Sequence, residues 1–133
     1  MATPDGWALV SLRDVAVSER NSFVIGPFGS DLVASDFRDH GVPVVFVRDI
    51  VSGRLRYKSA TFVEPAKALS LSAHSVESGD VLITKMGNPP GTACLYPKSA
   101  PSGVVTPDII RIRPDTERID PEFLAFALNG PTM

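Results

Sequence analysis

The chain has 133 residues and a formal net charge of −2, with 44% hydrophobic and 21% charged residues. This length fits one domain, 1–133, and leaves no room for a large catalytic domain beside a separate substrate domain. The longest apolar run, 123–128, is far shorter than the ~20 residues that span a bilayer. The first residues also lack a basic segment followed by an apolar one. We therefore expect a cytoplasmic domain without membrane contact.

Cysteine and histidine are too few for a disulfide or a metal cage. Cys94 is the only cysteine, and His40 and His74 are the only histidines. Cys94 lies between Ala93 and Leu95, which predicts a buried thiol that packs rather than reacts. We expect no metal and no cofactor.

The clearest secondary-structure signals are strands. Residues 42–50 form a β-branched run, and residues 56–63 alternate polar with apolar side chains; the turn residues Ser52 and Gly53 between them predict a hairpin. Residues 81–86 predict a buried strand, residues 92–96 its antiparallel return, and residues 108–113 the last strand.

Helices are expected to be few and short, because 12 Pro and 10 Gly are spread along the chain. Residues 65–76 can form one short helix. Asp120 and Pro121 suit the N-cap and first position of another helix through Leu128. The pattern predicts an α/β (α+β) fold with a twisted, mainly antiparallel sheet joined by turns too short for crossover helices.

Basic residues gather in the middle of the chain. Residues 48–67 carry five basic against two acidic side chains, and residues 81–113 carry four against one, whereas both ends of the chain are acidic. This segregation can create a basic face. Solvated strand and loop charges explain it equally well.

Catalytic motifs are missing from the sequence. There is no nucleophile elbow, phosphate-binding loop or dinucleotide fingerprint. The segment Asn88-Pro89-Pro90 resembles the Asn-Pro-Pro-aromatic motif of amino-methyltransferases, but Gly91 stands where the ring that stacks on a flipped base belongs. An enzyme is therefore the least favoured class.

The segment 79–91, GDVLITKMGNPPG, followed by Tyr96-Pro97, resembles the central signature of target recognition domains from specificity (S) subunits of type I restriction-modification systems. Other segments agree in the family's order, from the opening Trp7 onward: 7–12, 26–30 (GPFGS), 41–50 (GVPVVFVRDI), 109–114 and 119–124 (IDPEFL). The match covers almost the whole chain.

This resemblance implies a non-catalytic domain that recognises double-stranded DNA. In that family a full subunit pairs two recognition domains through long helices and directs a methyltransferase (modification) subunit and a restriction subunit to the site. The present chain stops at Met133, where the spacer helix would begin. A half-subunit, a truncated product and an excised piece are all compatible with this, with the second recognition domain in the same or another chain.

Candidate DNA-binding residues follow from side-chain chemistry. Arg and Lys bind guanine and phosphate, Asn binds adenine, and Thr binds phosphate. The candidates are Arg48, Arg54, Arg56, Lys58, Lys85, Asn88, Thr92 and Lys98. Lys85 and Asn88 can equally shape their own turn, and we exclude Arg111 and Arg113 as solvated or salt-bridged. The alternative function is a non-catalytic protein-interaction or ligand-binding module without DNA contact; a DNA reader would gather Arg54, Arg56, Lys58 and Lys85 on one concave face.

Overall fold

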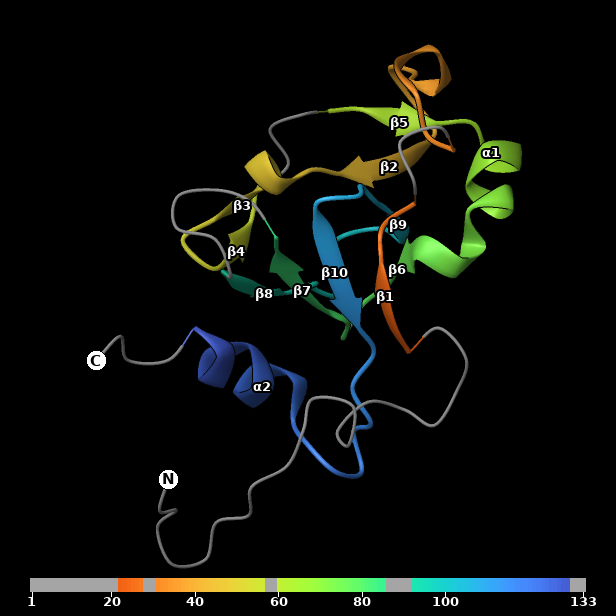
Figure 1. The fold of residues 1–133 in the computed structure, drawn as a ribbon. Helices are drawn as coiled ribbons and strands as arrows, with labels where there is room; N and C mark the ends of the chain where they lie inside the picture. Colours follow the sequence, from red (N-terminus) through yellow and green to blue (C-terminus); the bar gives the residue numbers. More distant parts are fainter. Residues whose placement is uncertain (1–21, 28–30, 57–59, 86–91, 130–133) are drawn as a thin grey trace, which may run out of the picture.

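A computed structural model of the chain describes residues 22–27, 31–56, 60–85 and 92–129. Most strands lie in two four-stranded sheets (Figure 1). The first sheet has the order β1 (Phe23–Ile25), β10 (Ile109–Ile112), β7 (Val81–Thr84) and β8 (Ala93–Leu95), all antiparallel. The second has the order β5 (Phe62–Val63), β2 (Val42–Val45), β9 (Gly103–Val105) and β6 (Ser75–Val76). A separate hairpin joins β3 (Ile50–Val51) to β4 (Arg54–Leu55).

Two α-helices and three short 3₁₀ helices complete the described part of the chain. They are α1 (Pro65–Ser70), α2 (Pro121–Leu128), η2 (Ala34–Asp36), η3 (Val47–Asp49) and η4 (Ser72–His74). The predicted fold class is confirmed, because the strands are short and the helices few. All strand pairs are antiparallel except β2 with β9.

The core has three clusters that follow the layers of the fold. The central cluster takes side chains from both sheets, including Leu82 and Cys94 from the first and Val45 and Val105 from the second. A second cluster joins the other face of the first sheet to α2, and a third joins the second sheet to Leu71 beside α1. The first sheet is thus covered on both faces.

Helix α2 forms where its start signals predicted. The Asp120 carboxylate accepts a hydrogen bond from the backbone N–H of Glu122 at 2.8 Å, and Pro121 is the first helical residue. Leu124 and Ala125 pack on the first sheet. Two predicted strands are also confirmed, since β7 and β8 pair antiparallel, and Cys94 is fully buried as expected.

The predicted strand over residues 42–50 is interrupted. It ends at Val45, and η3 follows before β3 begins. The buried carboxylate of Asp49 accepts a hydrogen bond from the backbone N–H of Phe46 at 2.9 Å, which closes this turn. Residues 57–59 of the predicted strand over 56–63 lie outside the described residues; of the others, Phe62 and Val63 form β5, which pairs with β2, whereas the partner of β3 is β4.

The single helix predicted over residues 65–76 is divided in three. α1 ends at Ser70, η4 follows, and Ser75 and Val76 form β6, which pairs antiparallel with β9. Pairing with a buried strand stabilises this end of the segment more than another helical turn would. No helix of the described residues is long and apolar enough to cross a membrane.

Candidate nucleic-acid interface

The basic hairpin, β3 and β4 with their connecting turn, is rigidly built. Ser52 and Gly53 have φ values of 52° and 76°, as in the type I′ turn that matches the twist of a two-stranded hairpin. Ile50 pairs with Leu55, and both contact the central cluster. The hairpin is therefore anchored in the core by one of its faces.

Two arginines occupy the outer face of this hairpin. Side chains alternate along a strand, so Arg54 and Arg56 point away from the side on which Leu55 is anchored. Both are exposed. The backbone N–H of Arg56 donates to the carbonyl oxygen of Asp49 at 2.5 Å, which extends the pairing beyond β4.

The hairpin groove is a depression of about 410 Å³ between the basic hairpin and the segment that leaves β8. It is lined by Gly53, Arg54, Leu55, Arg56, Leu95, Pro97 and Ser99. Arg54 and Arg56 are the charged residues of this lining, and the exposed Lys98 lies between two lining residues in sequence. The groove is therefore positively charged and suits an anionic ligand.

A second depression, the strand-end groove, has a volume of about 440 Å³. It lies at the carboxyl ends of the parallel strands β2 and β9. Its lining consists of Leu32, Phe37, Phe46, Val47, Arg48, Thr106, Pro107 and Asp108. The Arg48 guanidinium carbon lies 4.2 Å from the centre of the Phe46 ring, and Phe37 contacts the same ring edge-on. The cation–π contact holds Arg48 at this groove.

Lys85 lies at the strand-end groove rather than at the hairpin groove. Its backbone N–H donates to the carbonyl oxygen of Asp108 at 2.8 Å, and its Nζ lies 3.4 Å from the carbonyl oxygen of Pro107. Lys85 thus contacts two residues of the groove that Arg48 lines, Pro107 and Asp108, while Arg54 and Arg56 line the other groove. Thr92 is half-buried, and its backbone N–H donates to the hydroxyl of Thr84. Lys58 and Asn88 lie outside the described residues.

Ion pairs divide eight of the basic residues in the described part of the chain into two groups. Four Lys and Arg side chains contact a carboxylate: Arg38, Lys67, Arg113 and Arg118. Four others form no ion pair with a described residue: Arg54, Arg56, Lys85 and Lys98. All four are exposed. Their charge is available to a ligand.

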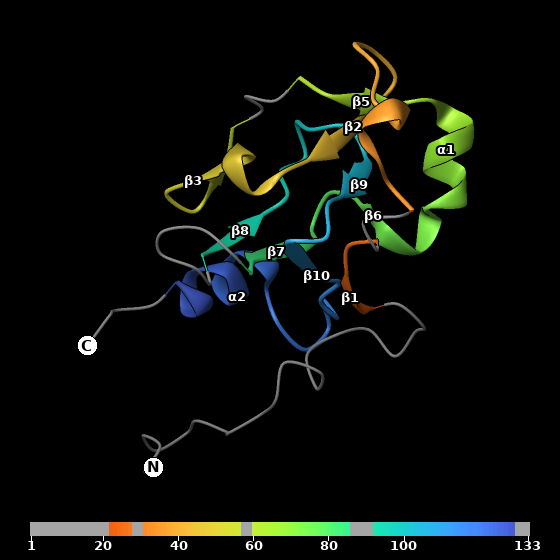
Figure 2. The same cartoon turned by 45° about the horizontal axis from the view of Figure 1, so that its top comes forward.

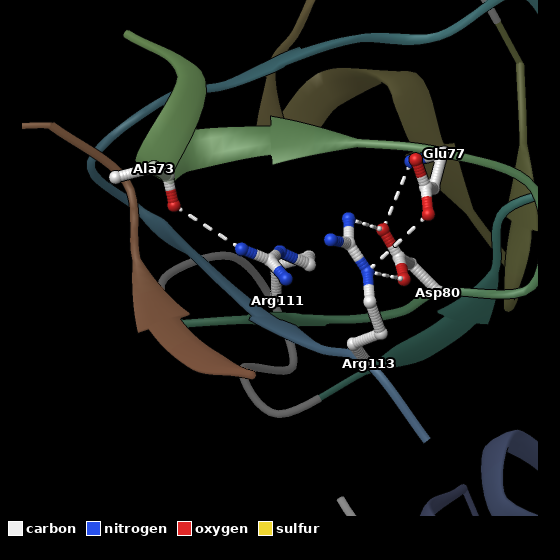
Figure 3. Close-up of polar contacts among 5 residues, drawn as sticks. All are labelled: Ala73, Glu77, Asp80, Arg111 and Arg113. Carbon is white, nitrogen blue, oxygen red and sulfur yellow. Dashed lines mark hydrogen bonds and ion pairs between the residues drawn. The ribbon is translucent and has the colours of Figure 1, made fainter. Parts of the chain in front are cut away.

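Arg111 and Arg113 lie in a different environment, between the two sheets (Figure 3). Arg113 makes two hydrogen bonds of 2.9 Å to the buried carboxylate of Asp80 and lies 3.6 Å from Glu77, which confirms the expected salt bridge. For Arg111 the expectation was wrong, because this side chain is neither solvated nor salt-bridged. It is 1% exposed, donates one hydrogen bond of 3.1 Å to the carbonyl oxygen of Ala73, and leaves Nε and Nη1 without partners.

Burial shifts two titratable groups between the sheets, Arg111 and Cys94, toward their neutral forms. Burial lowers the pKa of the Arg111 guanidinium and Arg113 lowers it further, while Asp80 and Glu77 act in the opposite direction. Burial also raises the pKa of the Cys94 thiol to about 11. Both groups are shifted toward their neutral forms, so this space is a weakly polar interior rather than a binding site.

Three residues that sequence reasoning did not select belong to these surfaces. Ser99 lines the hairpin groove, and Asp108 is exposed at the strand-end groove. Asn129 contacts β8 through two hydrogen bonds. Ser99 directly follows the candidate Lys98 in the sequence, and this position was a signal that it could belong to the same surface. The partners of Asp108 and Asn129 are distant in sequence and gave no local signal.

Comparison with known proteins yields structural matches only. No profile of a known protein family and no curated protein matches the sequence. Among solved structures, a chain described under complex assembly and conformational transition of the type I R-M system aligns with a TM-score of 0.68 and 17% sequence identity. The HsdS subunit from Thermoanaerobacter tengcongensis aligns with a TM-score of 0.64 and 19% identity. Each alignment covers 96% of this chain and 28% of the solved chain.

These alignments concern the fold, and they extend over nearly all of the present chain. The chain matches just over a quarter of the length of the solved chains. The resemblance predicted from the sequence is therefore confirmed at the level of the fold: this chain folds like one part of an HsdS subunit of a type I R-M system.

Proposed function

We propose that this chain is a target recognition domain of a type I restriction-modification specificity subunit and binds double-stranded DNA sequence-specifically. The observation that carries the proposal is the set of unpaired cations. Arg54, Arg56 and Lys98 are exposed at or beside one groove and form no ion pair with a described residue. The fold shared with an HsdS subunit supports the same function.

The hairpin groove suits the phosphate backbone. Arg54 and Arg56 lie two residues apart on the outer face of the basic hairpin, and Ser99 adds a hydroxyl to the same groove. Arg, Lys and Ser are the side chains that most often bind phosphate oxygens, and such contacts fix the position of a protein on DNA without reading sequence. This groove accounts for affinity.

The strand-end groove suits base recognition. Arg48 and Lys85 are hydrogen-bond donors of the kind that bind guanine, whereas the carboxylate of Asp108 can accept from an exocyclic amino group. Asp108 would repel a phosphate, so this groove is the less suitable one for the backbone. Asn88 and Thr92 extend the same end of β7 and β8 in sequence, and Lys58 follows the basic hairpin; their roles remain proposals.

The proposed partners follow from this function. The domain would work without chemistry of its own, directing a methyltransferase subunit and a restriction subunit to the DNA site. A second recognition domain, in the same or another chain, would bind the other half of the target. A function on cellular DNA agrees with the cytoplasmic location expected from the sequence.

One observation favours the alternative, a protein-interaction module. Phe123 and Phe126 of α2 are 48% and 70% exposed, and they are three residues apart on one helix face. Neither Phe123 nor Phe126 lines the hairpin groove or the strand-end groove. A protein partner and DNA can therefore use different surfaces of the same domain.

Selection from a randomised duplex library tests the proposed function. The full chain is used alone and together with a complementing second recognition domain, and binding is measured at several salt concentrations. We expect weak binding by the single chain that falls steeply with salt, because few cations face the DNA. Enrichment of one sequence motif by the pair supports the proposal. Absence of both enrichment and salt-dependent binding would favour the protein-interaction module instead.

Two substitutions then test how the recognition task is divided. Arg56→Ala should weaken cognate and unrelated duplexes about equally, since it removes a backbone contact. Asn88→Ala should relax preference at one base pair, at a cost of ~1 to 3 kcal/mol for the cognate site alone. Titration of both variants against cognate and scrambled DNA measures this. A sequence-selective loss for Arg56→Ala would reverse the assignment.

A further inference from the structure

Asn129 connects the end of α2 to the edge of the first sheet. Its Oδ1 accepts a hydrogen bond from the backbone N–H of Ala93 at 2.7 Å, and its Nδ2 donates to the carbonyl oxygen of Ala93 at 2.6 Å. β8 is the last strand of its sheet. Thr92, the preceding residue, accepts from Thr84 of β7, so the backbone groups of Ala93 face the open edge. The Asn129 amide satisfies both of them.

The same side chain also lies near the turn of the basic hairpin. A Cβ atom placed on Gly53 would lie 3.1 Å from Nδ2 of Asn129 and 3.5 Å from the carbonyl oxygen of Ala93. Together with its φ of 76°, this close approach explains why glycine occupies the position. The turn therefore lies close to the pair formed by Asn129 and Ala93, and β8 lies between the hairpin and α2 (Figure 2).

We propose that Asn129 is a positioning residue for DNA binding: it fixes the basic hairpin against β8, so that Arg54 and Arg56 are held over the hairpin groove. The proposal rests on the function proposed above. A side chain that is ordered before binding loses less conformational entropy when the ligand arrives, and supporting hydrogen bonds are the usual means of ordering it.

A role as an ordinary helix cap does not account for this side chain. The backbone N–H of Asn129 already bonds to the carbonyl oxygens of Ala125 and Ala127, as a helix end requires. Both hydrogen bonds of the side-chain amide go to Ala93 of β8, and the amide lies on the side of the hairpin turn. The Asn129 side chain thus connects α2 to β8 rather than capping the helix alone.

The matched control is Asp120→Ala at the other end of α2. Asp120 caps the helix by accepting from the backbone N–H of Glu122, so its loss should weaken the helix start, at the far end of α2 from Asn129. Asn129→Ala, Asp120→Ala, Arg54→Ala and the double variant Asn129→Ala/Arg54→Ala are titrated with duplex DNA. Amide hydrogen exchange at Arg54–Arg56 is followed in the full chain without DNA.

We expect Asn129→Ala to weaken duplex binding by roughly three- to tenfold and to speed exchange in the hairpin, while Asp120→Ala changes neither. The loss in the double variant should be smaller than the product of the two single losses, because Asn129 acts in part through Arg54. Equal effects of Asn129→Ala and Asp120→Ala, additive losses in the double variant, or unchanged hairpin exchange in Asn129→Ala would overturn the proposal. If the unmodified chain binds no duplex, the proposed function fails, and hairpin exchange still decides whether Asn129 positions the hairpin.

Discussion

Two pairs of arginines in this protein have the same spacing and opposite environments. Arg54 and Arg56 are exposed on the basic hairpin and form no ion pair with a described residue. Arg111 and Arg113 lie two residues apart at the end of β10, where Arg111 is 1% exposed and Arg113 is bonded to Asp80. Strand alternation places each pair on one face. It does not determine whether that face meets water.

The difference comes from the position of each strand in the fold. β10 lies between β1 and β7 in a sheet covered on both faces, so a side chain at its centre is buried on either side. The basic hairpin lies outside both sheets and is anchored on one face only, through Ile50 and Leu55. Tertiary topology, rather than local pattern, thus separates structural arginines from those free to bind a ligand.

The largest effect should come from removing the carboxylate of the buried pair. Asp80 is 1% exposed, accepts two bonds from Arg113 and also accepts from the backbone N–H of Glu77. Asp80→Ala would remove two charge-assisted hydrogen bonds from the half-buried Arg113 guanidinium and the acceptor of the Glu77 backbone N–H, and we expect it to lower the free energy of unfolding by about 3 to 5 kcal/mol. Urea denaturation measures this.

Glu77→Gln is the control for that substitution, because Glu77 contacts the same guanidinium from a half-exposed position. We expect a loss below about 1 kcal/mol. A loss below about 1 kcal/mol for Asp80→Ala as well would mean that the pair of Asp80 and Arg113 does not stabilise the fold.

Arg111→Met should not lower the free energy of unfolding, in contrast to Asp80→Ala. Two guanidinium nitrogens of Arg111 lack partners among the described residues, and the third donates to the carbonyl oxygen of Ala73. Replacing a buried, poorly paired charge by an apolar side chain of similar length should leave the free energy of unfolding unchanged or raise it by up to about 4 kcal/mol. Arg113→Met, measured in parallel, should destabilise the protein. A clear loss of stability in Arg111→Met would contradict this account.

The alkaline limit of stability should depend on Cys94. Its pKa is raised to about 11 in the folded state, whereas an unfolded thiol titrates near 8.5. As pH rises above about 9, the unfolded chain releases the proton and the folded chain retains it, so the free energy of unfolding falls until about pH 11. Denaturation at pH 8 and pH 10 should show a smaller decrease for Cys94→Ala than for the unmodified chain, although the variant starts less stable. An equal decrease in both proteins would exclude Cys94 as the cause.

The elements predicted correctly are those with local signals. Ser52 and Gly53 indicated a turn, Asp120 and Pro121 indicated a helix start, and 81–86 indicated a buried strand. The parallel pairing of β2 with β9 joins residues about 60 positions apart and has no local signature. The two-sheet arrangement depends on that pairing, and so does the burial of Arg111.

The candidate site was predictable in part for the same reason. Charge and alternation selected Arg54 and Arg56, which meet in one groove. The contact of Lys85 with Pro107, a residue of the groove that Arg48 lines, depends on strand pairing in both sheets. Ile109, which shares a face with Arg111 and is fully buried, was the available signal that this face points inward.

The smallest effect on stability should come from the exposed pair, and it sharpens the comparison most. Arg54→Ala and Arg56→Ala remove side chains that form no ion pair with a described residue, so each should change the free energy of unfolding by less than about 0.5 kcal/mol. If each side chain binds one phosphate, each variant should also reduce the slope of log affinity against log salt by about 1. Urea denaturation and duplex titration at several salt concentrations measure the two quantities on the same preparations. Loss of stability without a change in salt slope would place Arg54 and Arg56 with Arg113, as structural arginines.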